Sequence, residues 1–342
     1  MSFTATHMVV EAAEAPARVA ALLAANADIV GQLAARLRAR PPRAVTTLAR
    51  GSSDNVATFA RYLIETRLGI LTASSSPSVS SIYAAAPAMD DTLCLVISQS
   101  GMSPDLLAAA QAQRGAGALV VALVNAEDSP LAALADVTLP LRAGPELSVA
   151  ATKSFITGLA AVVQLAANWG DDRELLSAVA ELPALLQAAQ TLDWTAAIEP
   201  LARAEHLYVV ARGLGFAIAQ EAALKFKETC GLHAEAFSAA EVRHGPIALV
   251  GPGFPVMVFS QEDETEEGVA AAIAAFVSQG ADVIQVGGAA AAGLLLPSLR
   301  SHAVLEPIAQ AQSFYRFADR LARARGRDPD RPSHLAKVTE TL

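Results

Sequence analysis

The sequence predicts an α/β protein built from two doubly wound, parallel-sheet domains. Apolar, strand-like runs alternate with helical stretches along much of the chain, which is typical of parallel sheets. The triplet Ala49–Gly51 recurs as Ala211–Gly213, and Val96–Gln99 has its counterpart in Val258–Gln261, both at an offset of 162 residues (212 − 50 and 260 − 98). The length of 342 residues also suits two domains of moderate size. We therefore expect an internal duplication.

The expected elements follow in chain order. One N-terminal helix is predicted over Ala17–Arg40, because Pro41-Pro42 closes it. In the first copy, strands and helices alternate as Ala44–Ala49, Asn55–Arg67, Thr92–Ile97, Pro104–Gln113 and Ala118–Val124. In the second copy they are Leu207–Ala211, Phe216–Cys230, Pro255–Phe259, Thr265–Gln279 and Ala281–Val286. Helices Thr152–Asn168 and Asp172–Gln190 lie between the copies, and we place the domains at 1–190 and 191–342. Right-handed crossovers would make both sheets parallel.

Composition excludes several function classes. Hydrophobic residues make up 53% of the chain, but no apolar run approaches the roughly 20 residues of a membrane helix. The N-terminus does not resemble a secretory signal, so we expect a cytoplasmic protein. The net charge of −9 argues against nucleic acid as a partner. Cys94 and Cys230 are the two cysteines, which argues against a disulfide framework, and no CxxC or HExxH spacing predicts a metal site.

Two serine-rich loops in the first copy predict an anion site. Gly51-Ser52-Ser53 ends one strand, and Ser98–Ser103 ends another, immediately before a helix that starts at Pro104. Ser103 suits the N-cap, so backbone N–H groups would face the loop, an arrangement that binds phosphate. The alternative is that these serines only cap helices. The second copy carries Glu262-Asp263 at the corresponding position, where carboxylates would repel a phosphate.

The second copy contains a candidate acid–base helix. Glu221, Lys225 and Glu228 have the spacing i, i+4 and i+7 and therefore share one helix face. The helix opens from a strand and glycine turn, where open α/β sheets place ligands, and Gly231 would stop it. His244 follows in the next loop. The alternative interpretation is a solvated ion pair between Glu221 and Lys225.

These stretches together resemble the sugar isomerase (SIS) domain family over nearly the whole chain. That family includes the isomerase portion of glucosamine-6-phosphate synthase and stand-alone glucosamine-6-phosphate deaminases. The matching stretches are Gly51–Ser53, Ser98–Gly101, Val149–Lys153, Glu221–Glu228, His233–Phe237, Glu241 with His244–Pro246, and the tail Asp330–Thr339. The resemblance implies two flavodoxin-like, three-layer α/β/α SIS domains and an extended C-terminal tail.

The resemblance also implies a sugar phosphate as ligand. The residues at phosphate-binding positions are Gly51, Ser52, Ser53, Ser98, Gln99, Ser100 and Ser103. Val149 and Ala150 would offer backbone contacts to the sugar, and Ala336 would join the substrate-binding set. In the family the histidine loop reaches the neighbouring subunit's site, so a homodimer with a shared active site is implied.

The catalytic positions are implied in the same way. Glu228 would move a proton between C1 and C2, His244 would open the pyranose ring, and Lys337 would form a Schiff base or shuttle protons. Glu221 and Lys225 would be a supporting acid and amine. This chemistry requires no metal or organic cofactor.

The expected activity is an isomerising deamination, from glucosamine 6-phosphate and water to fructose 6-phosphate and ammonia. The chain begins at Met1-Ser2 without the synthase's glutaminase domain, so we expect no ammonia source of its own. Met102-Ser103 also replaces the synthase's usual Glu-Thr. The enzymic alternatives are another phosphosugar isomerase, a fructosamine-6-phosphate deglycase or an ammonia-dependent aminotransferase-type isomerase. An alternative from a different class is a non-catalytic sugar-phosphate sensor.

Overall fold

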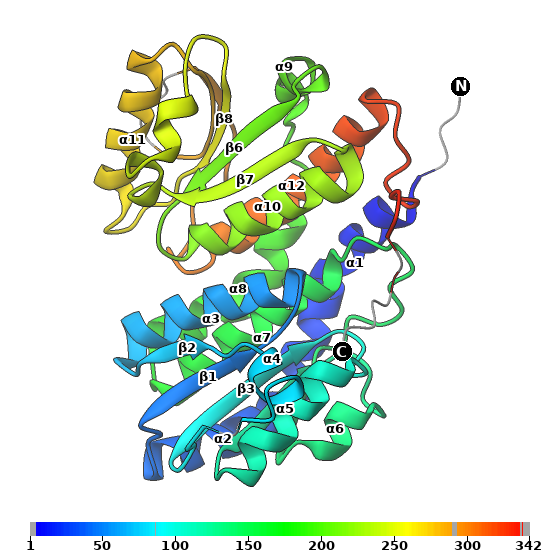
Figure 1. Ribbon diagram of the computed structural model, residues 1–342, viewed down its shortest axis with the longest axis vertical. Helices are drawn as coiled ribbons and strands as arrows, with labels where there is room; N and C mark the ends of the chain where they lie inside the picture. Colours follow the sequence, from blue (N-terminus) through cyan, green and yellow to red (C-terminus); the bar gives the residue numbers. More distant parts are fainter. Residues whose placement is uncertain (1–4, 86, 289–292, 336, 338–342) are drawn as a thin grey trace. The chain divides into compact units, whose positions relative to one another are not determined.

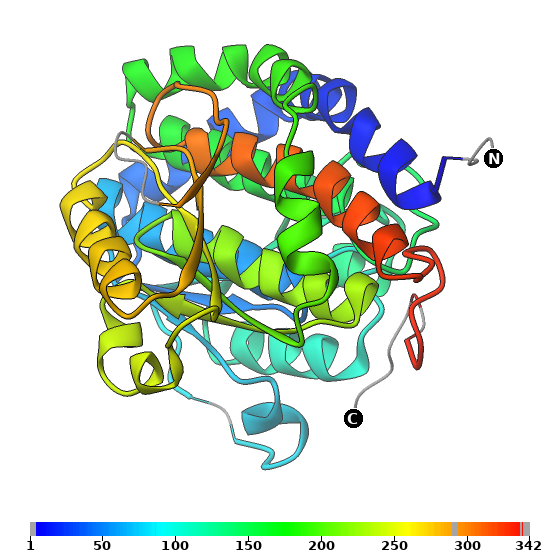
Figure 2. The same ribbon diagram turned by 90° about the horizontal axis from the view of Figure 1, so that it is seen from above.

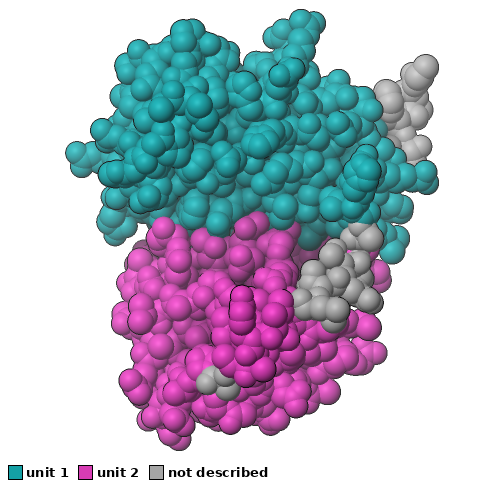
Figure 3. All heavy atoms as spheres, viewed as in Figure 1, with its two compact units in different colours: residues 1–16, 147–152, 181–335 teal, residues 17–146, 153–180, 336–342 magenta. Residues whose placement is uncertain are grey.

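A computed structural model describes residues 5–85, 87–288, 293–335 and 337 of the chain. The chain divides into two compact units (Figure 3). Unit 1 comprises residues 1–16, 147–152 and 181–335, and unit 2 comprises residues 17–146, 153–180 and 336–342. Each unit contains one five-stranded parallel sheet with flanking helices, which confirms the predicted fold class. No helix among the described residues is long and apolar enough to cross a membrane.

Unit 2 is built on a sheet with the strand order β2-β1-β3-β4-β5 (Figure 1). Its strands are β1 (Ala44–Leu48), β2 (Thr72–Ser74), β3 (Thr92–Ser98), β4 (Leu119–Val124) and β5 (Val137–Pro140). Its helices are α2 (Ala27–Ala39), α3 (Ser52–Leu68), α4 (Ser78–Ser81), α5 (Pro104–Gly115), α6 (Pro130–Leu134) and α7 (Lys153–Trp169). Every residue of β3 is buried, as expected of a central parallel strand covered on both faces.

Two helical layers cover the sheet of unit 2. On one face, Leu106 and Ala110 of α5 and Leu131 of α6 pack with Val96 and Val120 of the sheet in one apolar cluster. Helices α3 and α7 pack together and cover the opposite face (Figure 1). The unit is therefore a three-layer α/β/α sandwich whose central strands are shielded from water.

Unit 1 has the strand order β10-β9-β8-β6-β7. Its strands are β6 (His206–Ala211), β7 (His233–Ser238), β8 (Pro255–Phe259), β9 (Asp282–Val286) and β10 (Leu294–Leu296). Its helices are α9 (Ile198–Ala202), α10 (Gly215–Cys230), α11 (Glu266–Ser278) and α12 (Glu306–Ala324), with short 3-10 turns at Thr195–Ala197, Glu241–Arg243 and Pro246–Leu249. Helix α8 (Arg173–Ala189) begins in unit 2 and ends in unit 1. Numbered from its own first strand, the sheet repeats the strand order of unit 2.

The sheet of unit 1 is also covered on both faces. Helix α11 packs Val269 and Phe276 against Val256 and Val258 of β8. Helices α10 and α12 lie side by side on the other face (Figures 1 and 2), and the Phe226 ring of α10 meets an α12 ring edge-to-face, with centroids 5.1 Å apart. Aromatic contacts of this kind fix the angle between two helices as well as burying apolar surface.

Helix α10 ends where the sequence predicted. Gly231 is its C-cap in the left-handed conformation, with φ of +55°. A β-carbon at this position would lie 2.2 Å from the guanidinium carbon of Arg327. The positive backbone angle therefore favours glycine, and a larger residue would also displace the Arg327 side chain.

The predicted single helix Ala17–Arg40 was wrong. The structure has α1 (His7–Ala25) and α2, separated at Asn26. The Asn26 side chain is buried and donates a hydrogen bond to the backbone oxygen of Pro140 at 2.9 Å, which fixes the break. Helix α1 starts earlier than expected because the Asp330 carboxylate caps it, accepting hydrogen bonds from His7 N and Met8 N at 2.7 and 2.9 Å.

Candidate active site

Two serine loops of unit 2 leave the same edge of the sheet. Gly51 precedes α3 with φ of +56°, and Ser52 and Ser53 are the first residues of that helix, close after β1. Ser98 is the last residue of β3, and Gln99 follows it. Because β1 and β3 are hydrogen-bonded neighbours and run parallel, both loops lie at the carboxyl ends of adjacent strands. Open α/β sheets bind ligands at this kind of edge.

The loop after β3 is shaped by its own hydrogen bonds. Gly101 N–H donates to Ser98 Oγ at 3.0 Å, and Met102 N–H donates to Ser100 Oγ at 3.3 Å. Gly101 has φ of +64° and passes so close to Ser129 that a β-carbon would lie 2.2 Å from that hydroxyl. Ser103 is the N-cap residue of α5, as predicted, but its side chain makes no capping hydrogen bond. The loop therefore leads into the positive end of a helix, which favours an anion.

An ion pair links the two loops. Arg50, next to Gly51, donates to Asp105 Oδ2 from Nη2 at 2.7 Å and from Nε at 3.1 Å. Asp105 lies in the first turn of α5 and is buried, whereas the arginine side chain is half exposed. The pair fastens the loop after β1 to the helix that follows β3. Arg50 belongs to the Ala49–Gly51 repeat, which predicts the internal duplication but does not indicate the ion pair with Asp105.

Glu221, Lys225 and Glu228 form a cluster on α10 of unit 1. Lys225 Nζ lies 3.4 Å from Glu221 Oε1 and 2.6 Å from Glu228 Oε2. Tyr315 of α12 donates a further hydrogen bond to Glu221 Oε1 at 3.2 Å. The side chains of Lys225 and Glu221 are each 1% exposed, whereas that of Glu228 is 20% exposed. The alternative of a solvated ion pair was therefore wrong, because packing against α12 removes the lysine from water.

Lys225 carries a positive charge within this cluster. Burial by itself pulls the pKa of the Lys225 ammonium down, but the carboxylates of Glu221 and Glu228 outweigh burial and raise that pKa above its usual value. Lys225 is consequently a fixed cation at neutral pH rather than a base. Of the three side chains, Glu228 is the one that water or a ligand can reach.

His244 lies on a separate, exposed element of unit 1. It follows the short turn Glu241–Arg243 after β7, and its N–H donates to Glu241 O at 2.9 Å. The side chain is exposed, and Leu249 further along this segment is 71% exposed. Within the described residues, no group of three His, Cys, Asp or Glu side chains is placed to hold a metal ion.

The predicted sugar-contacting residues lie in a loop that α1 supports. Ala150 is fully buried and Val149 is half-buried. The buried carboxylate of Glu11 accepts hydrogen bonds from Leu147 N and, at 3.2 Å, from Ser148 N, just before these residues. Glu11 was missed from the sequence, because a single acid on a helix gives no sign of a loop 136 residues away.

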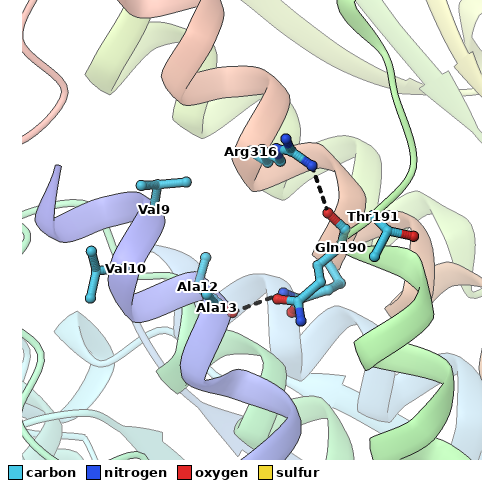
Figure 4. Close-up of a pocket in the computed structure, with 8 residues that line it drawn as sticks. Val9, Val10, Ala12, Ala13, Gln190, Thr191 and Arg316 are labelled. Atoms are coloured by element: carbon cyan, nitrogen blue, oxygen red, sulfur yellow. Dashed lines mark hydrogen bonds between the residues drawn. The ribbon is translucent and has the colours of Figure 1, made fainter. Parts of the chain in front are cut away.

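Helix α1 is itself attached to α12. The Gln312 amide donates to Ala12 O at 2.8 Å, and Arg316 of α12 donates to Gln190 O at 3.2 Å (Figure 4). A cavity of about 420 Å³ lies beside these contacts. Four α1 residues, including Val9 and Val10, form one half of its lining (Figure 4), and the other half is Gln190, Thr191, Gln312 and Arg316. The part of α1 that carries Glu11 is therefore fixed to α12 within unit 1.

Lys337 makes an ion pair within unit 2. Its Nζ lies 3.1 Å from Oε2 of Glu146, whose side chain is fully buried. Ala336, the neighbouring predicted contact, lies outside the described residues. Glu146 precedes the 147–152 loop and was not singled out in the sequence, because its partner is 191 residues away.

Family comparison confirms the resemblance. The SIS domain model matches residues 40–168, which include β1 to β5, and residues 200–291, which include β6 to β9. A glutamine–fructose-6-phosphate aminotransferase (isomerizing) from Aeropyrum pernix is 37% identical over 309 residues, covering 84% of this chain and 49% of that protein. Its counterpart from Symbiobacterium thermophilum is 36% identical over 331 residues, covering 90% and 53%. The chain thus spans about half the length of these relatives.

Solved structures agree with this assignment. A candidate phosphosugar isomerase from Silicibacter pomeroyi DSS-3 is 43% identical, with a TM-score of 0.91 over 95% of this chain and all of that chain. The C-terminal domain of glucosamine-fructose-6-phosphate aminotransferase from Francisella tularensis is 25% identical, with a TM-score of 0.87 over 97% and 99%. Because the family model covers most of the chain and both sheets have the expected topology, the protein belongs to the SIS domain family.

Proposed function

We propose that this SIS-family enzyme is a phosphosugar isomerase that deaminates glucosamine 6-phosphate, giving fructose 6-phosphate and ammonia. The observation that carries the proposal is the α10 cluster, in which one partly accessible carboxylate, Glu228, is held by a buried cation. Aldose–ketose conversion needs such a group to take a proton from one carbon and return it to the next. Relatives that are 37% and 36% identical carry fructose 6-phosphate in their names, which supports the substrate class.

The serine loops of unit 2 are proposed to hold the phosphate. Ser98 and Ser100 shape the loop through their hydroxyls, and the N-terminus of α5 follows directly. Ser52 and Ser53 stand at the end of the neighbouring strand, at the start of a second helix. Two helix N-termini and several hydroxyls suit a dianion, since they offer hydrogen-bond donors and positive dipole ends.

The proton transfers are assigned to unit 1. His244 would protonate the ring oxygen and deprotonate the anomeric hydroxyl, which opens the pyranose. Glu228 would then remove the proton from C2 and deliver it to C1, which converts the aminoaldose to a ketose imine. Water adds to the imine carbon, and ammonia leaves. Lys225 supports this step as a cation that holds the Glu228 carboxylate in place, with Glu221 balancing its charge.

Deamination is preferred because it needs only water as a co-substrate. The reverse reaction needs a supply of ammonia in addition to the sugar phosphate. The names of the relatives favour this reverse, aminating direction as a second candidate. Both directions use the same acid–base groups. The concentrations of ammonia and of the two sugar phosphates therefore decide the direction, and the roles of Glu228 and His244 stay the same.

A homodimer with a shared active site is part of the proposal. The segment around His244 is exposed and carries the apolar Leu249 at its end, a combination that suits coverage by a second subunit. Mixing His244→Ala protein with Glu228→Gln protein tests this idea. Subunit exchange should restore part of the activity, because a hybrid dimer would contain one intact site. Activity that stays at the level of the separate variants would contradict a shared site.

One assay tests the reaction itself. Purified protein is incubated with glucosamine 6-phosphate, N-acetylglucosamine 6-phosphate or galactosamine 6-phosphate, and ammonia and ketose phosphate are measured. We expect equal amounts of both products from glucosamine 6-phosphate. Glu228→Gln should lower kcat by at least a hundredfold, whereas Glu267→Gln, an exposed acid on α11, should leave it unchanged. Absence of ammonia from all three sugars would refute the deaminase, and full activity of Glu228→Gln would refute the assigned base.

A further inference from the structure

We propose that Glu146 is the positioning residue for Lys337: it holds the ammonium group in an ion pair and accepts a proton from it before the amine attacks C2 of the ketose phosphate. The inference rests on the proposed function, because that ketose phosphate is the product of the proposed deamination. It begins from one contact, the 3.1 Å separation between Lys337 Nζ and Glu146 Oε2.

Glu146 is built into unit 2 as a buried anion. Its Oε1 accepts the backbone N–H of Ser154 at 3.1 Å, and its Oε2 accepts the Ser154 hydroxyl at 2.7 Å. Ser154 lies in the first turn of α7, so the carboxylate also lies at the positive end of a 17-residue helix. These two hydrogen bonds hold the carboxylate in one position. Glu146 is therefore rigid before the lysine arrives.

This anchor gives the Lys337 side chain a buried partner within unit 2. The Glu146 side chain is 0% exposed, and that of Lys337 is 26% exposed. The lysine thus retains access from outside while its ammonium bonds to a buried partner. Among the described residues 325–335, which separate α12 from this part of the chain, there is no helix or strand. The Glu146 contact restrains where Nζ lies within unit 2.

The same contact supplies a route for the proton. An ammonium ion is not a nucleophile, so Lys337 must become a free amine before it attacks a carbonyl carbon. Transfer of a proton from Nζ to Glu146 Oε2 turns the ion pair into an amine and a carboxylic acid. No unpaired charge is left in the buried site, which favours this acceptor over a transfer that would strand the carboxylate.

The resulting step balances without another reagent. The Nζ electron pair forms a bond to C2 of the ketose phosphate, and the carbonyl π pair moves to oxygen. That oxygen takes one proton from Nζ and the second from the Glu146 carboxylic acid, and it leaves as water. The products are a protonated imine on Lys337 and a regenerated Glu146 carboxylate.

Reductive trapping tests the inference. The full-length protein is mixed with fructose 6-phosphate and sodium borohydride at pH 7.5, and the adduct on Lys337 is measured by mass spectrometry of its peptide. We expect Glu146→Gln to lower the trapping rate at least tenfold. Asp136→Asn is the matched control, because Asp136, like Glu146, pairs with a cationic side chain, that of Arg114, and accepts a backbone N–H in unit 2. Its trapping rate should equal that of the wild type.

A second variant guards against misfolding. Glu146→Asp keeps the charge but shortens the side chain, so it should fold and trap at an intermediate rate. Circular dichroism establishes which variants are folded. If Glu146→Gln is not folded, the trapping rate of Glu146→Asp tests the inference by itself. Trapping at the wild-type rate in whichever variant folds would overturn the inference.

The proposed function has its own readout in the same samples. Exchange of solvent deuterium into C1 of fructose 6-phosphate reports proton transfer at carbon and should require Glu228. If the wild type neither exchanges nor traps, the proposed function fails. If it exchanges but forms no adduct on Lys337, or if Glu146→Gln traps as fast as the wild type, only the role of Glu146 fails.

Discussion

Replacing Lys225 with methionine tests whether the α10 cluster is a true buried ion network. The substitution leaves Glu221, which is 1% exposed, without its cation. Removing one partner of a buried pair lowers stability by about 3–5 kcal/mol. Tyr315 still donates to Glu221 at 3.2 Å, and the more exposed Glu228 can turn toward water. We therefore expect a loss near the lower end, about 3 kcal/mol.

Urea unfolding at pH 7, followed by circular dichroism, measures this loss. The double variant Lys225→Met/Glu221→Gln should recover more than half of it, because no unpaired charge then remains buried. Lys227→Met is the matched control, since Lys227 is exposed on the same helix and its loss should change stability by less than about 0.5 kcal/mol. A loss below about 1 kcal/mol for Lys225→Met would refute the network. So would a double variant no more stable than the single one.

The stability difference should also depend on pH. The folded-state pKa of Lys225 is raised above its ordinary value of 10.5 by Glu221 and Glu228, against the opposing effect of burial. A raised pKa contributes stability that is fully present below the unfolded-state pKa and is lost as pH rises through the folded-state pKa. The difference between wild type and Lys225→Met should be constant from about pH 7 to 9 and shrink above about pH 10.5. A difference that grows above that pH would contradict the assignment.

Three further outcomes are expected elsewhere in the molecule. Gly101→Ala should destabilise the protein by about 1–3 kcal/mol, because φ of Gly101 is +64° and a β-carbon would clash with Ser129. The same change should weaken binding of glucosamine 6-phosphate at least tenfold, and an unchanged affinity in calorimetry would contradict this. Glu11→Gln should raise KM more than it lowers kcat in steady-state kinetics, because Glu11 holds the loop of the proposed sugar contacts; the opposite pattern would exclude that role. Cys94 and Cys230 should resist an aromatic disulfide reagent at pH 8 until the protein is unfolded, because burial raises their pKa values to about 12 and about 11; rapid labelling of native protein would be the contrary result.

The central strands could be predicted because burial on both faces leaves a continuous apolar run in the sequence. Strand β8 has the predicted bounds, and β1 and β3 differ from theirs by one residue. The edge strands β2 and β10 have only three residues each, too few for any periodicity. Strand β7 pairs along its whole length with β6, but it is partly exposed and contains the charged Glu235 and the polar His233, so no strand could be predicted there. The strand forms because its backbone can hydrogen-bond to the free edge of β6.

The candidate site was predictable to the extent that it is local. Helix geometry places Glu221, Lys225 and Glu228 on one face, and strand ends place the serine loops, whatever the rest of the chain does. Burial of the lysine is a long-range property, because Tyr315 reaches Glu221 from 94 residues away. The Glu146 contact is likewise non-local. Partners of this kind leave no spacing pattern, which is why supporting acids were missed while the helix face was found.

The loop after β8 in unit 1 differs from the corresponding loop after β3 in unit 2 in its charge and in its hydrogen bonds. At the 162-residue offset, Glu262 of unit 1 corresponds to Ser100 of unit 2. Glu262 N–H donates to Oε2 of Glu306 at 3.0 Å, and Ser301 N–H donates to Oε1 of the same buried carboxylate at 3.1 Å. A backbone donor at the position of the proposed phosphate loop is thus already satisfied by an internal carboxylate. Repulsion by Glu262 and Asp263 and occupation by Glu306 act in the same direction. Both the charge and the hydrogen bonds of this loop therefore argue against phosphate binding in unit 1, which supports the proposal that the loops of unit 2 hold the phosphate and α10 the acid–base groups.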